Sequence, residues 1–269
     1  MSFWCIASDP CGICCVALTY TMILYADYVV VFELLLPWLG LSSHCCMLIL
    51  LFLAISALAL SSHARTMLTN PGAVPLEYHP PEISEPGSLP MCSRCNGYKP
   101  PRAHHCSQCD RCIMKMDHHC PWVNNCVGAN NQKHFVLFVG YTALLSTMAL
   151  ALLLARIVAA PKTDSPKRDL YFQSTEPTSS FLYMCLLFFE ALLFGLFTLA
   201  MLCEQFSSII SDETGIERLK HDYTAPQRSA LANLSETFGR PVSLLWLLPT
   251  AVRFHGLSWW DLMPTEHEV

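Results

Sequence analysis

Four long apolar stretches, separated by polar segments, dominate the pattern of residues along the chain. They run from about Cys11 to Phe32, Cys45 to Ser61, Phe135 to Val158 and Phe181 to Ile210. A helix rises about 1.5 Å per residue, so about 20 apolar residues cross the hydrocarbon core of a bilayer. The pattern therefore predicts an all-α polytopic membrane protein with four transmembrane helices.

The polar segments divide the chain into four parts. Residues 1–72 hold helices one and two, and residues 135–210 hold helices three and four. Between them, residues 73–134 form a linker and a cysteine-rich domain, and residues 211–269 form a tail. Pro71 and Gly72, at the end of the first part, are residues that terminate a helix. We predict that the cysteine-rich domain is an insertion between helices two and three.

Composition supports a membrane protein and narrows its chemistry. The 269 residues are 53% hydrophobic and only 14% charged, and the mean hydropathy is +0.37. A net charge of −5 argues against a nucleic-acid-binding protein. Fifteen cysteines would suit a secreted disulfide scaffold, but their regular C-x2-C spacing beside membrane segments favours reduced, metal-bound thiols in the cytosol. Met1–Pro10 contains no Lys or Arg, so we expect no cleavable signal peptide.

The distribution of Lys and Arg predicts the orientation in the membrane. Four spans place both termini on one side. Seven basic residues lie between spans two and three and none lies in the first loop, although Lys162, Lys167 and Arg168 in the third loop weaken the contrast. Positive charge favours the cytosolic side. We therefore predict that the cysteine-rich domain and both termini face the cytosol.

The cysteine-rich part contains more zinc ligands than two sites need. Two four-ligand sites of the Cys3His type use six cysteines, and seven are present. The thiol left over is assigned to Cys120, because Asp117, His118 and His119 directly precede it. Spacing alone allows either a sequential or an interleaved division of the ligands. We predict two structural zinc ions and one reactive thiol.

At these residues a resemblance becomes specific. The run from Cys92 to Phe135 resembles the cysteine-rich domain of the DHHC family of protein S-acyltransferases. It has two C-x2-C knuckles, the Asp-His-His-Cys tetrad ending at Cys120, then Cys126, Asn131 and Phe135 in the family's order. The sequence of residues 212–217 and the pair Phe238-Gly239 resemble the Golgi-associated branch of the family. The resemblance thus implies a zinc-stabilised cytosolic domain in a polytopic acyltransferase.

The resemblance also implies a role for individual residues. Cys120 would be the nucleophile, His118 its base and Asp117 the group that orients His118. The zinc ligands would be interleaved, Cys92, Cys95, His105 and Cys112 holding one ion and Cys106, Cys109, His119 and Cys126 the other. Contacts to coenzyme A would come from Lys99, Arg102, His104, Trp122 and the tail residue Asn233.

The length of the acyl chain predicts which residue lies at the end of the acyl cavity. An extended sixteen-carbon chain is about 20 Å long, which is roughly a dozen residues of helix. Counted from Lys133, this depth is reached at Leu145, where the family has a side chain that closes the acyl cavity. We therefore expect Leu145 to line the cavity. The alternative is that Leu145 faces lipid or a neighbouring helix.

The implied reaction moves a palmitoyl group from palmitoyl-CoA to Cys120 and then to a cysteine of a protein substrate, by ping-pong kinetics. The partners would be the bilayer, acyl-CoA and membrane-associated or membrane proteins with cytosolic cysteines, and no nucleic acid. The Golgi is the first expectation for the compartment, with the endoplasmic reticulum as the alternative.

Two departures from the family pattern favour a rival interpretation, a zinc-stabilised scaffold without enzymatic activity. Asn70 stands where the family's Asp-Pro-Gly motif has Asp, and Gly215 stands where its Thr-Thr-x-Glu motif has the second Thr. A second rival, a metal transporter, is disfavoured because transport sites belong within the spans. Here the Cys and His residues gather outside them.

Overall fold

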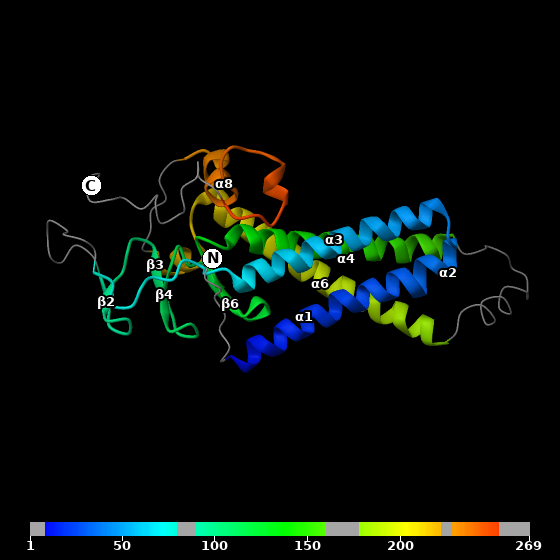
Figure 1. Ribbon diagram of the computed structural model, residues 1–269, viewed down its shortest axis with the longest axis horizontal. Coiled ribbons are helices and arrows are strands. Elements are labelled where there is room, and N and C mark those ends of the chain that lie inside the picture. The colour runs from blue at the N-terminus through cyan, green and yellow to red at the C-terminus, as the bar shows by residue number, and fades with distance from the viewer. Residues whose placement is uncertain (1–8, 80–89, 160–177, 222–227, 253–269) are drawn as a thin grey trace, which may run out of the picture. The chain divides into compact units, whose positions relative to one another are not determined.

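Four long helices span the apolar stretches. The computed structural model describes residues 9–79, 90–159, 178–221 and 228–252. Among these, four helices are long and apolar enough to cross a membrane (Figure 1). They are α1 (Pro10–Tyr28), which continues through the π-helical η1 (Val29–Leu35) into α2 (Leu36–Leu39), then α3 (Ser43–Leu68), α4 (Gln132–Val158) and α6 (Thr178–Ser211). The predicted fold class is confirmed.

Each helix extends beyond the apolar stretch that predicted it. The expected second span ended at Ser61, but α3 continues to Leu68 through His63 and Arg65. Apolar runs mark the length in contact with lipid, whereas backbone hydrogen bonds decide where a helix ends. Pro37 does not interrupt the first span, because the chain stays helical from η1 into α2.

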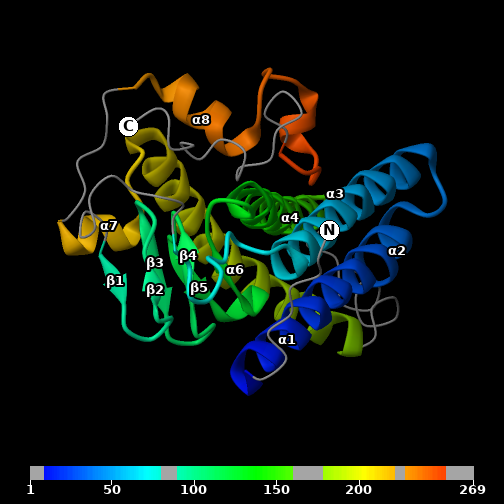
Figure 2. The same cartoon turned by 60° about the vertical axis from the view of Figure 1, so that its left-hand side comes forward.

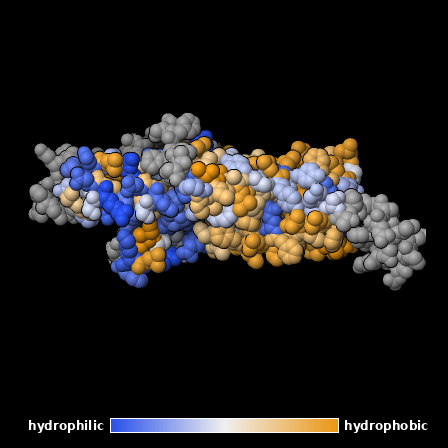
Figure 3. All heavy atoms as spheres, turned by 90° about the horizontal axis from the view of Figure 1, so that it is seen from below, coloured by the Kyte–Doolittle hydropathy of each residue, from blue (hydrophilic) through white to orange (hydrophobic). Residues whose placement is uncertain are grey.

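One compact unit consists of residues 18–60 and 139–202. Its helical segments run alongside one another (Figures 1 and 2). Buried polar groups pair between helices: Ser56 Oγ donates to Asp27 Oδ2 over 2.7 Å, and Tyr25 donates to the Tyr183 carbonyl over 2.9 Å. Hydrophobic side chains cover the helical surface visible in Figure 3. This surface is the one that a lipid environment stabilises.

The other unit consists of residues 1–17, 61–138 and 203–269, as far as they are described. Its centre is a series of three antiparallel hairpins, which together contain only short strands. They are β1 (Met91–Cys92) with β2 (Gly97–Tyr98), β3 (Ala103–Cys106) with β4 (Arg111–Met114), and β5 (His118–Cys120) with β6 (Asn125–Val127). Two-stranded hairpins are marginally stable in water, so this unit needs another source of stability.

The tail of this unit is helical. It contains α7 (Gly215–Lys220), α8 (Ala230–Phe238) and the short 3-10 helix η3 (Leu244–Leu247). Figure 2 shows α7 beside the strands of the hairpins. The predicted apolar end of the tail, Leu244 to Trp260, is described only to residue 252, so its outer half lies outside the described residues.

Candidate metal centres and active site

The register of two hairpins brings a histidine and a cysteine together across the strands. His105 lies opposite Cys112 in the β3–β4 pair, and His119 lies opposite Cys126 in the β5–β6 pair. Directly opposed residues in an antiparallel pair have side chains on the same face, about 5 Å apart at Cβ. Each pair therefore supplies half of a four-ligand site.

The turns of two hairpins supply the other halves. Cys92 and Cys95 lie at the β1–β2 turn, and Cys106 and Cys109 lie at the β3–β4 turn. The residue after each knuckle, Asn96 or Asp110, has a positive φ of 50° or 47°. Asn and Asp tolerate this left-handed conformation better than most residues, and it lets the chain fold back tightly.

The two halves combine into two clusters, each made of three cysteines and one histidine. The first contains Cys92, Cys95, His105 and Cys112, and the second contains Cys106, Cys109, His119 and Cys126. The β3–β4 hairpin thus gives its paired strands to the first cluster and its turn to the second, and the neighbours His105 and Cys106 belong to different clusters. The strand alternation explains why the ligands are interleaved rather than sequential.

The spacing of the ligand atoms fits zinc. Tetrahedral zinc, with Zn–S about 2.3 Å and Zn–N about 2.0–2.1 Å, requires N and S about 3.5 Å apart. His105 Nδ1 lies 3.5, 3.3 and 4.0 Å from the sulfurs of its cluster. His119 Nδ1 lies 3.7, 3.4 and 3.6 Å from those of the second. Four protein ligands leave no open position, so such a metal would be structural.

Strand β5 separates the candidate metal ligand His119 from the candidate catalytic residues His118 and Cys120. Successive side chains of a strand point to opposite faces. His119 joins the second cluster, so His118 and Cys120 share the other face. The Cys120 thiol is buried and hydrogen-bonds His118. One strand therefore contributes a ligand to a candidate metal cluster with one face and pairs a thiol with an imidazole on the other.

The carboxylate of Asp117 has three hydrogen-bond donors. His118 Nδ1 and Gln205 Nε2 each lie 2.7 Å from Oδ2, and the Gly215 N–H donates to Oδ1 over 2.9 Å. Burial alone would raise the pKa of Asp117, but these donors and the nearby His118 hold it below its ordinary value. Asp117 therefore holds the His118 ring in one orientation.

His118 lies between Asp117 and Cys120. Burial lowers the pKa of its imidazole, but the hydrogen bonds and charges of Asp117 and Cys120 outweigh this effect and raise the pKa to about 9. The ring of Phe135 meets the imidazole edge-on, with centroids 5.2 Å apart. Phe135 thereby restricts the orientation of the His118 ring through ring packing.

Two buried asparagines fasten this strand pair to the end of α3. Asn125 Nδ2 donates to the carbonyls of Thr66, Met67 and Thr69, over 3.0–3.1 Å. Asn131 Nδ2 donates to the Thr66 carbonyl over 3.1 Å. The last carbonyls of a helix lack partners within it, so these amides satisfy the C-terminus of α3. The β5–β6 pair is thus held by the end of α3 and also contributes ligands to the second candidate metal cluster.

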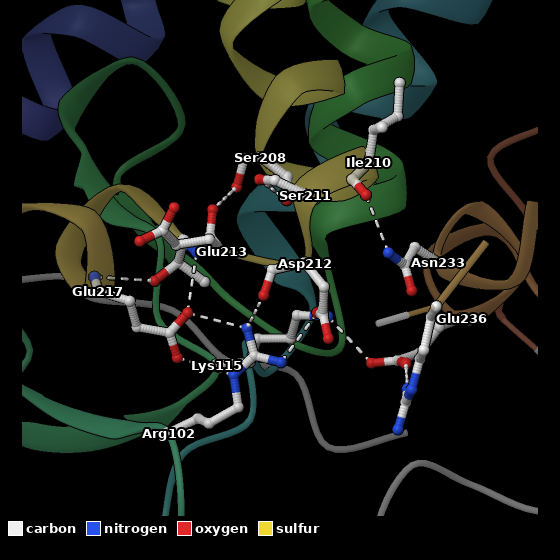
Figure 4. Close-up of polar contacts among 12 residues, drawn as sticks. Arg102, Lys115, Ser208, Ile210, Ser211, Asp212, Glu213, Glu217, Asn233 and Glu236 are labelled. Atoms are coloured by element: carbon white, nitrogen blue, oxygen red, sulfur yellow. Dashed lines mark hydrogen bonds and ion pairs between the residues drawn. The ribbon is translucent and has the colours of Figure 1, made fainter. Parts of the chain in front are cut away.

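A buried ion network joins the β3–β4 hairpin to the tail (Figure 4). Arg102 contacts both carboxylate oxygens of Glu217, at 2.7 and 2.8 Å, and Asp212 Oδ1 at 2.9 Å. Lys115 Nζ lies 2.9 Å from both Asp212 and Glu236. Burial alone would raise the pKa of Asp212 and Glu217, but Arg102, joined by Lys115 at Asp212, holds both below their ordinary values. The network fixes α7 and α8 against the hairpin.

The residues expected to contact coenzyme A have different surroundings. Arg102 is occupied by Asp212 and Glu217, and the Asn233 amide donates to the Ile210 carbonyl over 2.9 Å. The Trp122 carbonyl accepts a hydrogen bond from His63, 2.9 Å away. Lys99 is half-buried. His104, the last of the expected residues, has its Nδ1 3.2 Å from Nζ of Lys220.

Sequence reasoning did not single out Gln205, Lys220, Asn125 or His63. Gln205 could have been recognised from the sequence, because it is a polar residue near the end of an otherwise apolar helix. The other three depend on contacts between distant segments.

Both departures from the sequence pattern make hydrogen bonds to neighbouring segments or residues. Asn70 Oδ1 accepts from the N–H groups of Gly72 and Ala73, over 3.0 and 2.7 Å, and an amide oxygen serves as well as a carboxylate. Thr214 and Glu217 form a capping box at the start of α7. Gly215 contacts Asp117 through its backbone N–H, which any residue except proline would supply. A side chain at position 215 would have its Cβ 3.6 Å from Asp117 Oδ1, so Gly215 lacks the hydroxyl that the Thr of the family pattern would place beside Asp117.

Comparisons with known proteins agree with this geometry. Residues 85–222 match a family model described as DHHC palmitoyltransferase. Palmitoyltransferase ZDHHC3 of Rattus norvegicus is 43% identical over 255 residues, which are 92% of this chain and 84% of the relative. Palmitoyltransferase ZDHHC7 of Rattus norvegicus is 43% identical over 262 residues, 93% and 82% of the two chains. Palmitoyltransferase ZDHHC21 of Mus musculus is 32% identical over 244 residues, 90% of each chain.

Proposed function

Because the chain belongs to the DHHC palmitoyltransferase family and is a protein S-acyltransferase, we propose that Cys120 carries the acyl group during its reaction. The observation that supports this role is the shared face of β5, which pairs Cys120 with His118 while His119 joins a metal cluster. A nucleophile, a base and a group that orients the base are the parts that covalent acyl transfer requires.

The proposed reaction has two half-reactions. The thiolate of Cys120 attacks the carbonyl carbon of palmitoyl-CoA, the new S–C bond replaces the old one, and CoA leaves as the thiol. A cysteine thiolate of a membrane or membrane-associated protein then attacks the acyl-enzyme, and Cys120 is released. In each step His118 would take the proton from the attacking thiol and pass it to the leaving sulfur. Asp117 would keep the imidazole in place.

Two zinc ions would stabilise the hairpins without entering the chemistry. The ligand spacing fits tetrahedral zinc, and each cluster has four protein ligands. In a unit with such short strands, metal binding would supply folding free energy that the core cannot. The second ion would hold His119, and thereby keep β5 extended beside Asp117.

Acyl loading tests the proposed function. Incubation of the purified full-length protein with palmitoyl-CoA is expected to add one palmitoyl mass that hydroxylamine removes, because hydroxylamine cleaves thioesters. Peptide mapping is expected to find the adduct at Cys120 within minutes of mixing. An adduct-free protein that retains its zinc would contradict the proposal.

The phosphates of coenzyme A need cationic partners. We propose that Lys99 and the neighbours His104 and Lys220 provide them, with the Trp122 region beside the tetrad. Arg102 and Asn233, expected for the same role, have protein partners already. For these two residues we propose that they hold the tail against the hairpins.

Arg102→Gln separates the two roles of Arg102. Removing the cation leaves the buried carboxylate of Glu217 without its ion-pair partner and leaves Asp212 with Lys115 alone, and breaking a buried ion pair costs about 3–5 kcal/mol. We expect a lower unfolding temperature, measured by tryptophan fluorescence in detergent. Arg218→Gln is the matched control, because its partner Glu204 is exposed and such pairs contribute about 0–1 kcal/mol. An unchanged unfolding temperature with a higher KM for palmitoyl-CoA would assign Arg102 to the coenzyme instead.

Leu145 remains the proposed end of the acyl cavity. It is buried on the continuous helix α4, which argues against a position facing lipid. Leu145→Tyr adds volume, and overpacking costs about 1–3 kcal/mol, so preference should shift toward shorter acyl-CoAs. Leu145→Ala should admit longer ones.

Mass spectrometry after incubation with an equimolar acyl-CoA mixture measures this preference. Leu144→Tyr is the control, because Leu144 is exposed on the same turn. If the chain-length profile of both Leu145 variants equals that of the parent at normal total loading, Leu145 lies outside the cavity.

The protein is an integral membrane protein, and we propose that the hairpin unit and both termini face the cytosol. The excess of Lys and Arg between spans two and three supports this orientation. The Golgi is the proposed compartment, because the sequence of residues 212–217 and the pair Phe238-Gly239 resemble the Golgi-associated branch of the family.

A further inference from the structure

The first turn of α1 lies against the turn of the β5–β6 hairpin. Gly12 is so close to Asn124, in that turn, that a Cβ at this position would collide with the Asn124 side chain. The same Cβ would lie 2.9 Å from Oδ2 of Asp9, the residue just before the helix. A glycine at position 12 therefore leaves room for both side chains and lets Asp9 approach the hairpin. Both segments belong to the same compact unit.

The two carboxylate oxygens of Asp9 face different groups. Oδ1 accepts a hydrogen bond from the Cys11 N–H over 3.1 Å, which caps the start of α1. Oδ2 lies 4.0 Å from Nε2 of His119, and the Asp9 side chain is only 14% exposed. This separation is about 1 Å longer than a hydrogen bond, so the carboxylate acts on the imidazole through a charge that is largely shielded from water.

The Nε2 atom of His119 needs such a neighbour. Nδ1 of the same ring faces the sulfurs of the second cluster, so the hydrogen of a metal-binding imidazole is on Nε2. Nε2 is buried, and no group in the described part of the chain forms a hydrogen bond with it. Carboxylates beside the second nitrogen of a ligating histidine fix the ring and make the ligand more basic.

We propose that Asp9 is a positioning residue for His119, whose charge stabilises the imidazole N–H and thereby holds the ring in the second metal cluster. The proposal rests on the proposed zinc sites. His119 and Cys120 are neighbours on β5, so the start of α1 also helps to keep the strand that carries the proposed nucleophile in place.

The first cluster contains a similar pair that serves as an internal comparison. Asp110 Oδ1 lies 3.7 Å from Nε2 of His105, but the Asp110 side chain is 83% exposed. Water and salt screen the charge of an exposed carboxylate, and exposed ion pairs contribute little. The difference in exposure therefore predicts that the second cluster depends on its carboxylate far more than the first does.

Metal release from the purified full-length protein tests this role. The zinc-loaded protein is mixed with a chelator and N-ethylmaleimide, and peptide mapping follows the alkylation of the cysteines of each cluster with time. Asp9→Asn retains the helix cap, because Asn and Asp cap equally well, and removes the charge. We expect Cys106, Cys109 and Cys126 to be alkylated about 10-fold faster than in the parent, with the rates at the first cluster unchanged.

Two further variants separate the charge from the helix cap. Asp9→Glu keeps the charge but is a poorer cap, so its second cluster should release metal at a rate closer to that of the parent than Asp9→Asn does. Asp110→Asn is the matched control and should leave the rates at both clusters unchanged. The reverse order at position 9, with normal release in Asp9→Asn and fast release in Asp9→Glu, would assign Asp9 to capping alone and overturn the proposal.

The remaining outcomes separate this proposal from the proposed function. Unchanged rates in Asp9→Asn, or equal acceleration at both clusters, overturn the role of Asp9 and leave the role of Cys120 intact. A parent protein that holds no zinc contradicts the metal sites and overturns the proposal with them. Acyl loading at Cys120, measured on the same samples before the chelator is added, tests the proposed reaction independently.

Discussion

Cys120→Ser is expected to abolish both acyl loading and transfer to protein substrates. A serine hydroxyl is far less acidic than a thiol and gives almost no anion beside His118, whereas the thiolate is the nucleophile. Removing the nucleophile of a covalent enzyme lowers the rate on the order of 10⁴-fold or more. The measurement is the rate of radiolabelled palmitate incorporation into the enzyme and into a cysteine-containing substrate.

Two controls accompany this variant. Cys203→Ser changes an exposed cysteine of α6 and should load normally. The zinc content of Cys120→Ser should equal that of the parent, because Cys120 belongs to neither cluster. Normal loading of the serine variant would show that another thiol is the carrier.

Cys109→Ala is expected to release the metal of the second cluster and unfold the hairpin unit. Structural zinc contributes apparent binding free energies of about 10–16 kcal/mol. A domain has a stability of about 5–15 kcal/mol, so loss of one ion removes about the whole margin. Activity should fall with it, since His119 would no longer hold β5 in place.

Elemental analysis and limited proteolysis measure this outcome. The parent is expected to contain about two zinc ions per chain, and Cys109→Ala to be cleaved between residues 90 and 130 at protease concentrations that the parent resists. Cys46→Ala, which changes an exposed cysteine of α3, is the control. A zinc-free preparation with full activity would exclude a structural role of the metal.

The sequence by itself determined what depends on local composition and spacing. Four apolar stretches predicted the four helices, because the length needed to cross a bilayer is set by residue type alone. The tetrad and the knuckles identified the family, because cysteine spacing within a knuckle is a local requirement of metal binding. Helix ends were less predictable, since α3 stays hydrogen-bonded through the polar residues His63 and Arg65.

Tertiary structure decided which groups meet. Spacing left the division of the ligands open, and the register of the hairpins groups them in an interleaved way, because strand alternation sends His105 and Cys106 to different clusters. The tertiary structure also shows what Asn70 and Gly215 contribute: an acceptor oxygen for the Gly72 N–H from the first, and a backbone N–H for Asp117 from the second.

The partners of the reactive strand come from distant parts of the chain. Gln205 reaches Asp117 from α6, and Gly12 at the start of α1 packs against Asn124. A hydrogen bond or a close contact between segments many residues apart leaves no periodicity in the sequence. Such contacts depend on how the helices and hairpins pack, and packing is set by the shapes of many side chains together.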